Sequence, residues 1–515
     1  MEARAMRYLF RWGATCTLIG AVITMPTGIA APPSTVVSTT SQQQLATQID
    51  TQIDQPRFAS ASWGISVVSL DNGHTLYTRN ADRLLQPAST AKLYTAAFVL
   101  DTLGPDYRVP TQLIAIGSVE HGRLNGSLML HGMGDPTLGT PGTNSDWADQ
   151  LATQLAANGV HEVHGDLIAD DSYFEGPPIG SGWEARDLQS WFAVPASALS
   201  VQENVADLTI SPTGIGGTAS LMFDPPGSMP HVINRIVTGT RNDINLYRAP
   251  GDSTLYAFGT IAQRSEPQNF KLAIVDPAWF AGTLLREALS RHGIHVDGSV
   301  RVQHWPQQSA ADPDKGTVVA QVLSPPVMEV LSRGLKRSQN LYLQNLLQIA
   351  GVKQKVAAEQ AGDPDAGFLS SEAWGTRAMH ELLNHIGISP DTAQMEEGAG
   401  LSRQDLATPN AMVRLLTYLA SQPYGNDLRD ALPNAGVDGT LEFRMRDTPA
   451  MGNVHAKTGS MTYVRCMVGY VTTASGEHLA FAIMLNNYVQ DADEPSPSRN
   501  LDAIVELLAA YHGHG

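Results

Sequence analysis

The type of secondary structure that the sequence predicts changes twice along its 515 residues, and this pattern limits the folds open to the chain. Alternating apolar residues flank Asn72-Gly73 and predict a hairpin, and an apolar helical pattern follows from about Thr90. From about residue 106, short strand-like runs such as "TQLIAIGSV" alternate with Gly and Pro turns. Near residue 326 helical patterns return, and strand-like runs and a helix close the chain. We therefore expect an α+β protein.

The two ends of the chain share a mixture of strand-like and helical patterns that the middle lacks. We therefore infer one domain that is interrupted by an inserted region. The expected domain comprises residues 51–105 and 322–515, and the β-rich insert, of one or two domains that we expect to be nested, comprises residues 106–321. The Ser/Thr/Gln-rich residues 31–50 are expected to form a linker. Two or three consecutive independent domains are the alternative.

Residues 1–30 have the pattern of an export signal. Arg4, Arg7 and Arg11 precede the apolar run "GATCTLIGAVITM", and small residues follow in "TGIAAPPS". The run is short for a membrane span, so we expect an exported protein, periplasmic or extracytoplasmic, without a stable membrane anchor. An uncleaved signal anchor is the alternative. The closing segment "LDAIVELLAAYHG" has no Lys or Arg and is typical of a core helix, not of a membrane-surface helix.

The charge and cysteine content exclude some classes of partner and of stabilisation. The formal net charge is −17, whereas a nucleic-acid-binding face is positive, so we expect no nucleic-acid partner. Cys16 falls within the export signal, which leaves Cys466 as the one cysteine of the mature chain. No intramolecular disulfide can form, and stability must come from packing.

The first candidate for chemistry is the pair Ser89 and Lys92 in "QPASTAKLYTAAFVL". Of the seven lysines, Lys92 is the one with a serine three positions before it. Residues i and i+3 of a helix are neighbours, so the Lys92 amine can take the proton of the Ser89 hydroxyl if burial lowers its pKa. The alternative is that Ser89 simply caps the helix.

Two further groups of candidate site residues follow Lys92 along the chain. In "LKRSQNLYLQN", Ser338 can relay a proton and Asn340 can bind a substrate amide, although the second copy Ser498-Arg499-Asn500 shows that the triplet also arises by chance. In "VHAKTGSMTYV", Lys457, Thr458, Gly459 and Ser460 open a strand. The ammonium and hydroxyl suit a substrate carboxylate, and glycine permits close approach of a substrate backbone. An ordinary lysine in a turn is the alternative.

The order S-x-x-K, S-x-N, K-T-G is the strongest functional signal, because such a combination occurs in serine enzymes that act on penicillin-like substrates. The sequence motifs of other classes of enzyme and binding site are incomplete or missing. There is no G-x-S-x-G, "HEVH" is one residue short of the helical zinc pair, and "GIGGTA" and "GAGLSR" lack the last glycine of a dinucleotide loop. We expect no cofactor and no metal.

The sequence resembles the class C low-molecular-mass penicillin-binding proteins, of the type called penicillin-binding protein four, which are D-alanyl-D-alanine carboxypeptidases and endopeptidases. Beyond the three motifs, the resemblance extends to "GDPTL", "HGDLIADDSYF", "FAVPASALSV", "GAGLSR" and "LPNAGVDGTL" and covers roughly residues 55 to 490. The long stretch between Lys92 and Ser338 also fits, since this family carries inserted domains there. Gln339 stands where relatives often have Asp.

The resemblance implies a transpeptidase or β-lactamase-like domain, with a five-stranded antiparallel sheet covered by helices. It also implies the roles of the site residues. Ser89 attacks the penultimate D-alanine, Lys92 accepts its proton and Ser338 relays a proton to the leaving D-alanine. Asn340 holds the substrate amide, Lys457 and Thr458 hold its carboxylate, and the N–H groups of Ser89 and Ser460 form an oxyanion hole.

The expected partners are therefore peptidoglycan peptides, with β-lactam antibiotics as covalent inhibitors, and the oligomeric state stays open. Two other functions remain as alternatives. A β-lactamase would turn penicillin over quickly, and a non-catalytic wall-binding protein on the same fold would bind wall peptides without releasing D-alanine.

Overall fold

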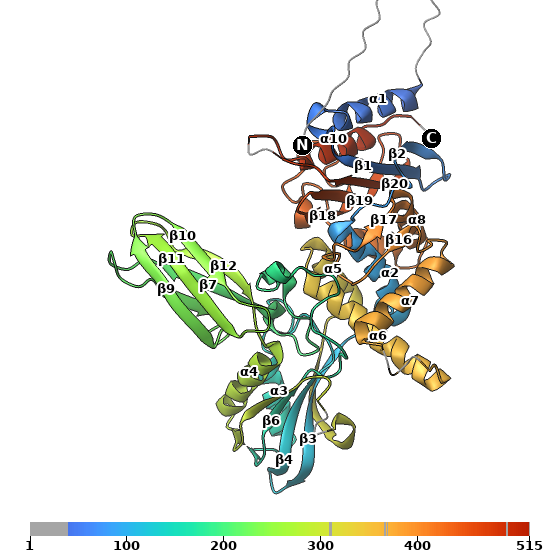
Figure 1. Ribbon diagram of the computed structural model, residues 1–515. Helices are drawn as coiled ribbons and strands as arrows, with labels where there is room; N and C mark the ends of the chain where they lie inside the picture. The colour runs from blue at the N-terminus through green and yellow to red at the C-terminus, as the bar shows by residue number, and fades with distance from the viewer. Residues whose placement is uncertain (1–39, 308–311, 365–366, 368, 491–492, 514–515) are drawn as a thin grey trace, which may run out of the picture. The chain divides into compact units, whose positions relative to one another are not determined.

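The computed structural model describes residues 40–307, 312–364, 367, 369–490 and 493–513, and the signal predicted for residues 1–30 lies outside this part of the chain. The described residues from Ser41 onward form one compact unit (Figure 1). Among them, no helix has the length and apolar character needed to cross a membrane.

A five-stranded sheet in the order β18-β19-β20-β1-β2 joins the two ends of the chain. All neighbouring strands are antiparallel, and β1 pairs with β20 from Ser62↔Asn486 to Ser69↔Leu479. This confirms the expected sheet and shows why residues so distant in sequence share one fold. The strands are β1 (Ser62–Ser69), β2 (Thr75–Arg79), β18 (His455–Met461), β19 (Val464–Thr472) and β20 (His478–Asn486).

The hairpin predicted at Asn72-Gly73 connects β1 and β2. Gly73 has the expected positive φ of 78°, but Asn72 does not, so the connection is not a two-residue turn. The longer loop is closed by the Gly73 N–H, which donates to the Ser69 carbonyl at 3.0 Å, and by the His74 N–H, which donates to the Asn72 side chain at 2.7 Å. The position of the turn was therefore correct and its type was wrong.

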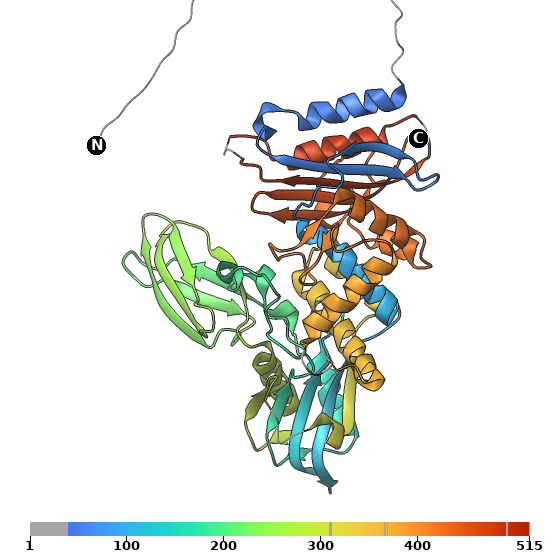
Figure 2. The ribbon, with the colours of Figure 1, turned by 45° about the vertical axis from the view of Figure 1, so that its right-hand side comes forward.

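One face of this sheet is covered by α1 (Ser41–Ile53) and α10 (Ser498–Ala509), which lie side by side in both ribbon views (Figures 1 and 2). The linker predicted for residues 31–50 is wrong from Ser41 onward. Leu45, Ile49 and Ile53 recur every four residues and are buried in the core beneath the sheet. The polar residues between them are on the exposed side of the helix. Because these polar residues are abundant, the sequence pattern did not indicate a helix here.

The other face packs against a helical layer that carries the predicted motifs. Helix α2 is buried at every residue from Lys92 to Leu100, as its apolar pattern predicts. It contacts α5, α6, α7 and α8. The layer comprises α2 (Lys92–Leu103), α5 (Val327–Lys336), α6 (Asn340–Ala361), α7 (Ser371–His385), α8 (Pro409–Ala420) and the short α9 (Gly425–Asp430), with the small strands β16 (Ala393–Gln394) and β17 (Leu406–Ala407).

The inserted region contains two kinds of β-structure. The first is a mixed seven-stranded sheet, whose core includes side chains of α3 (Trp147–Ala157) and α4 (Pro277–Arg291). Its strands are β3 (Pro110–Glu120), β4 (Arg123–Gly132), β5 (Glu162–Val163), β6 (Leu167–Asp170), β13 (His295–Val296), β14 (Val300–Gln303) and β15 (Thr317–Leu323).

The second part of the insert is a pair of three-stranded sheets in the orders β10-β11-β9 and β12-β7-β8, which share a small core. We call this part the sandwich. It falls in sequence between strands of the seven-stranded sheet. Its strands are β7 (Val205–Ser211), β8 (Ser220–Asp224), β9 (His231–Gly239), β10 (Asp243–Tyr247), β11 (Thr254–Ala262) and β12 (Gln268–Ala273). The boundaries proposed for the domains stay predictions.

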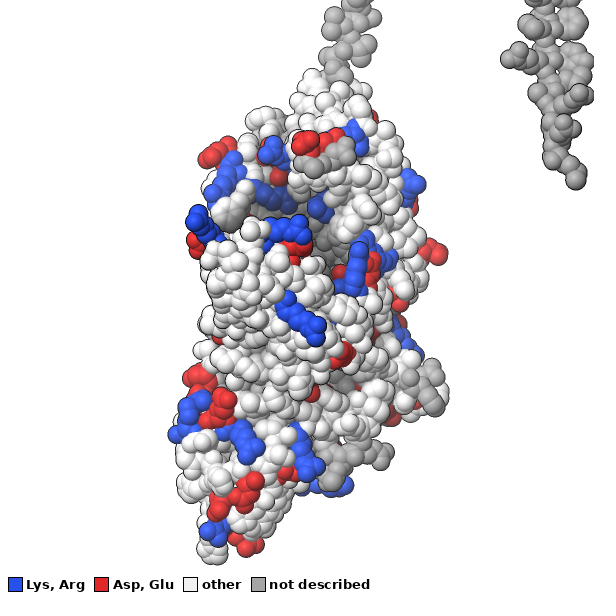
Figure 3. Space-filling model, turned by 60° about the vertical axis from the view of Figure 1, so that its left-hand side comes forward, with Lys and Arg blue, Asp and Glu red and all other residues white. Residues whose placement is uncertain are grey.

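Charged side chains are unevenly distributed over the surface. Although the chain carries a net charge of −17, Figure 3 shows Lys and Arg side chains around a hollow in one face. The overall acidity therefore does not exclude an anionic ligand locally.

Candidate active site

Ser89 lies in a 3-10 turn, Ala88–Ala91, that runs directly into α2. It is half-buried, whereas the other three residues of the turn are buried. No side chain caps the turn or the helix, so Ser89 is not the helix cap that was the alternative. Its hydroxyl instead accepts a hydrogen bond from Lys92 Nζ at 3.0 Å.

Lys92 is fully buried, and its ammonium has three oxygen acceptors. Besides Ser89 Oγ, Lys92 Nζ donates to Asn340 Oδ1 at 2.6 Å and to the carbonyl of Ala399. Burial lowers the Lys92 pKa from 10.5 to about 7, although the charges of Glu397 and Asp405 oppose this shift. A large fraction of Lys92 is thus uncharged near neutral pH and able to accept a proton.

Ser338 and Lys457 form a second pair. Ser338 lies between α5 and α6 with φ of +56°, a left-handed conformation that serine rarely adopts. Lys457 Nζ donates to Ser338 Oγ at 2.8 Å and to the Thr458 carbonyl at 2.8 Å. Burial, and then the positive charge of Lys92, hold the Lys457 pKa well below its usual value. The two lysines are therefore electrostatically linked.

Strand β18 lies at the edge of the five-stranded sheet and carries the K-T-G residues. The Ala456 N–H donates outward to Pro433 instead of to β19. Because N–H groups alternate along a strand, those of Thr458 and Ser460 also point outward. The edge is thus open to an extended ligand. The sequence run "SMTYVRC" is not one strand, because a turn at Thr462 and Tyr463 separates β18 from β19.

The absence of a side chain at Gly459 is required by packing within the protein. A Cβ at this position would lie 2.6 Å from the Pro87 carbonyl oxygen and 3.2 Å from Ala88 Cβ. The protein's own segment before Ser89 thus approaches Gly459 closely, and the approach of a substrate backbone stays a prediction. The glycine allows the turn that carries Ser89 to lie against β18.

Asn340 and Gln339 connect α6 to neighbouring parts of the chain. The Asn340 side chain accepts from Lys92 and donates to the Phe192 carbonyl at 2.6 Å. Gln339 Nε2 donates to Glu203 Oε2 at 2.7 Å, and Glu203 also accepts from Arg337 and Tyr342. The S-x-N triplet is therefore held by residues of the predicted insert.

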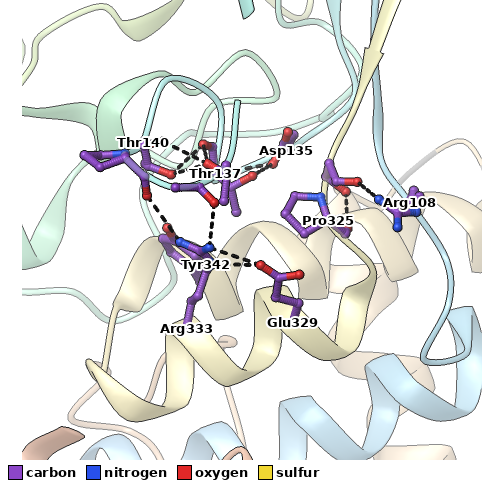
Figure 4. Close-up of polar contacts among 12 residues, drawn as sticks. Arg108, Asp135, Thr137, Thr140, Pro325, Glu329, Arg333 and Tyr342 are labelled. Atoms are coloured by element: carbon purple, nitrogen blue, oxygen red, sulfur yellow. Dashed lines mark hydrogen bonds and ion pairs between the residues drawn. The ribbon is translucent and has the colours of Figure 1, made fainter. Parts of the chain in front are cut away.

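The insert contacts α5 through a second loop, drawn in Figure 4. Arg333 donates to the carbonyls of Pro141 and Gly142 at 3.5 and 3.1 Å, while Glu329 pairs with the same guanidinium at 3.1 Å. Thr140 bonds to Thr143 and to the Thr137 carbonyl, which stiffens the loop. These contacts hold the insert beside the helix that leads to Ser338.

Sequence reasoning missed the buried carboxyl pair Glu397 and Asp405. Glu397 accepts the N–H groups of Ala399 and Leu401, both at 2.7 Å, and so fixes the loop whose Ala399 carbonyl binds Lys92. Burial, and then the charge of the adjacent Glu397, raise the Asp405 pKa well above its usual value. The segment "GAGLSR", which follows Glu397, was noted in the sequence, but the sequence alone did not indicate a role for it.

One trio among the described residues could hold a metal ion: Glu162, His164 and Asp297. These residues are part of or follow β5 and β13 of the insert, and the last two are exposed. His164 belongs to the "HEVH" segment. None of the three contacts the residues around Ser89, so the trio has no part in this site.

The structure thus gathers the predicted residues into two linked groups, Ser89-Lys92-Asn340 and Ser338-Lys457-Thr458, with Gly459 and the exposed Ser460 on the adjoining edge strand. The second S-x-N copy lies at the start of α10, against the opposite face of the sheet, where Asn500 binds Arg57. That copy is a chance match.

Comparison with known proteins identifies the family. Residues 45–511 match the model of the D-Ala-D-Ala carboxypeptidase 3 (S13) family. The chain belongs to this family. It is therefore a serine-type D-Ala-D-Ala carboxypeptidase, which confirms the predicted family and enzyme class.

Relatives of this S13 family enzyme support the assignment along nearly the whole chain. A D-alanyl-D-alanine carboxypeptidase of Actinomadura sp. (strain R39) is 32% identical over 499 residues, which are 94% of this chain and 88% of the relative. The D-alanyl-D-alanine carboxypeptidase DacB of Haemophilus influenzae is 28% identical over 432 residues, 82% and 85% of the two chains. A crystal structure of penicillin binding protein 4 from that organism has a TM-score of 0.76 at 26% identity and covers 90% of this chain and 99% of its own.

Proposed function

We propose that the protein is an exported DD-carboxypeptidase and DD-endopeptidase that cleaves D-Ala-D-Ala ends and cross-links of peptidoglycan peptides through an acyl-enzyme on Ser89. The observation that carries this proposal is the hydrogen bond from the buried Lys92 Nζ to Ser89 Oγ. It supplies a nucleophile and a base of suitable pKa within one turn of the chain.

In the first step, uncharged Lys92 accepts the Ser89 proton as Ser89 Oγ bonds to the carbonyl carbon of the penultimate D-alanine. The oxygen of that carbonyl becomes an oxyanion, which the N–H groups of Ser89 and Ser460 stabilise. The outward direction of the Ser460 N–H on the edge strand supports this role.

In the second step, the bond to the terminal D-alanine breaks and its nitrogen takes a proton. Ser338 relays this proton, which it can receive from Lys457 at 2.8 Å. Water then attacks the acyl carbon and gives one proton through Ser338 to Lys457, the bond to Ser89 Oγ breaks, and Ser89 Oγ takes its proton back from Lys92. Asn340 has one amide hydrogen beyond its bond to Phe192, which suits a substrate carbonyl.

The open edge of β18 supports binding of an extended peptide, with its carboxylate near Lys457 and Thr458. A cross-link offers the same D-Ala-D-Ala bond with a longer leaving group, which is the basis for proposing endopeptidase activity. Penicillins would acylate Ser89 as mimics of this end. A penicillin binding protein 4 from Haemophilus influenzae is known in complex with a β-lactam.

Labelling with a fluorescent penicillin tests the assignment of Ser89. We expect covalent labelling of the wild type and none of Ser89→Ala, with Ser498→Ala, in the chance copy of S-x-N, as the matched control. Equal labelling of wild type and Ser89→Ala would refute the nucleophile.

Product analysis separates the other activities. Mass spectrometry of cross-linked and uncross-linked muropeptides should show release of D-alanine and of monomers. Rapid penicillin hydrolysis without a persistent adduct would indicate a β-lactamase. Peptide binding without any D-alanine release would indicate a non-catalytic wall-binding protein.

A further inference from the structure

The sandwich has an outer face that no other part of the described chain covers. In the sheet β10-β11-β9, apolar side chains alternate with exposed ones on all three strands. The inward residues, such as Ile236, Leu255 and Ala257, form the core with the second sheet. The outward residues face solvent, where polar side chains would be the usual choice.

Aromatic and aliphatic side chains occupy this outer face instead. Strand pairing places Tyr247 beside Tyr256 and Tyr256 beside Ile233, in one row across the sheet. In the next row, Phe258 lies between Asn245 and Arg235.

The rings are strongly exposed: Tyr247 by 51%, Phe258 by 45% and Tyr256 by 37%. Neither phenol hydroxyl has a hydrogen-bond partner among the described residues. Each ring therefore retains a free surface, and each tyrosine a free polar group.

The outer face of the other sheet, β12-β7-β8, is different. Asp207 pairs there with Lys271 in an ion pair of 2.8 Å, and Thr209 bonds to Asn269 at 2.9 Å. Asp207 and Lys271 also line a cavity of about 620 Å³ together with Gln339. The polar face thus adjoins the S-x-N triplet, and the aromatic face is on the opposite side of the sandwich.

We propose that the aromatic face binds the sugar chain of peptidoglycan and holds the enzyme on this polymer. A pyranose ring has an apolar C–H face that stacks on an aromatic ring, and a rim of hydroxyl groups that needs hydrogen-bond partners. The rows of this face supply both, because Asn245 and Arg235 flank Phe258 and the tyrosines carry free hydroxyls. The inference rests on the proposed function, since the peptide substrate is attached to such a chain.

The size and charge of the face favour a sugar chain over a second copy of the protein. At the usual spacing, the nine residues of β9 and of β11 and the five of β10 cover only about 400 Å², whereas a stable protein interface needs roughly 800 Å² from each partner. A third row consists of Asp243, Thr260 and Val237. Its Asp243 is paired with Arg241 at 3.4 Å, so Arg235 adds a single positive charge to the three rows. A face with so little charge suits an uncharged, hydroxyl-rich polymer better than a polyanion.

Because this face is opposite the polar face beside Gln339, the bound chain need not be the one whose peptide is being cleaved. Binding to a neighbouring chain would keep the enzyme on the wall while Ser89 acts on peptide arms within reach. The aromatic residues would then affect cleavage of the intact wall and leave cleavage of a small soluble peptide unchanged.

Cosedimentation with purified peptidoglycan tests this inference, using the full chain with Tyr247→Ala, Tyr256→Ala and Phe258→Ala combined. We expect the apparent affinity to fall about tenfold or more, both for sacculi and for insoluble chitin, an uncharged polymer of an N-acetylated sugar. The matched control, Thr209→Ala with Asn269→Ala on the polar face, should bind like the wild type. Release of D-alanine from a soluble D-Ala-D-Ala peptide should be equal in all three proteins.

Equal cosedimentation of the aromatic variant and the wild type would overturn the inference, as would binding of intact sacculi without binding of chitin. So would a concentration-dependent dimer that the triple variant abolishes, because a second copy would then occupy the face. If the triple variant does not fold, Phe258→Ser alone, at an exposed position, gives the same test. Failure of the proposed function is distinguishable, because it would appear as wild-type protein that releases no D-alanine.

Discussion

The pockets around Lys92 and Lys457 differ in how they balance a buried positive charge. Both lysines are fully buried. Behind Lys92 lie the carboxyl groups of Glu397 and Asp405, which raise its pKa against the effect of burial. The groups of the described chain that shift the Lys457 pKa include no carboxylate, and its charged neighbour is Lys92. Lys92 thus carries its own counter-charge, and Lys457 lacks one until an anion binds.

This difference fits the two different roles that we propose for Lys92 and Lys457. A base needs a pKa near the working pH, which partial compensation by carboxyl groups gives to Lys92. A carboxylate-binding lysine gains most if the ligand supplies the missing charge, because the ligand then relieves the cost of burying the ammonium. Binding of a substrate carboxylate should therefore raise the pKa of Lys457.

The largest effect is expected from Lys92→Ala. Without the base, the rate of acylation by penicillin should fall by about 10³-fold, as measured by stopped-flow or by time-resolved labelling. Lys353→Ala, at an exposed position on α6, is the control and should react like the wild type. A loss of less than tenfold would mean that another group removes the Ser89 proton.

A smaller effect is expected when the carboxylate at Lys457 is removed from the substrate. Amidation of the terminal D-alanine should lower kcat/KM by roughly 10- to 100-fold, which is typical of a lost charged hydrogen bond. In Lys457→Ala, amidation should have little further effect, because the partner of the carboxylate is already absent. Additive losses from the two changes would show that Lys457 does not bind this group.

Glu397→Gln should shift the pH dependence of catalysis. The Glu397 charge raises the Lys92 pKa, so its removal lowers that pKa and leaves Lys92 uncharged at more acidic pH. The acidic limb of kcat/KM should therefore move to lower pH, by on the order of one pH unit.

Asp405 supplies the internal check of this prediction. The Asp405 charge also raises the Lys92 pKa, so Asp405→Asn alone should move the acidic limb to lower pH as well. Loss of Glu397 removes one cause of the raised Asp405 pKa, so the Asp405 carboxylate can replace part of the charge lost in Glu397→Gln. In the double variant, the acidic limb of kcat/KM should accordingly move to lower pH by more than in Glu397→Gln. A move of this limb to higher pH in either variant would contradict this account of Lys92.

Much of the fold follows from local sequence patterns. Apolar runs and helical periodicity placed the hairpin, β19, β20, α2 and α6, because most of the residues in these elements are buried and therefore apolar. The site residues could be proposed from three short motifs. Helix α1 could not be found in this way, because its apolar residues are few and lie within a polar segment.

The surroundings of the motifs could not be predicted, because they depend on contacts between distant residues. The Ala399 carbonyl that accepts from Lys92 lies 307 positions away, and the Phe192 carbonyl that accepts from Asn340 lies 148 positions away. Neither carbonyl has a signature in the sequence, since every residue offers one. The role of Gln339 could likewise not be predicted, because it depends on the contact with Glu203.

The smallest effect concerns Gln339, which links the two lysine pockets because Ser338 binds Lys457 and Asn340 binds Lys92. Gln339→Asp would bring a second carboxylate toward Glu203, which now accepts the Gln339 amide at 2.7 Å. We expect a loss of about 1–2 kcal/mol in the free energy of unfolding, measured by thermal or denaturant unfolding, and a modest fall in acylation rate.

Combining Gln339→Asp with Glu203→Gln should restore stability, since the amide and carboxylate simply exchange places across the same contact. Glu203→Gln alone should weaken the bond to Arg337, which now donates to Glu203 at 2.7 Å. If the double variant is as unstable as the sum of the single ones, repulsion by Glu203 is not the cause. The triplet would then be held by its left-handed turn at Ser338, and the contact with the insert would contribute little to linking the pockets.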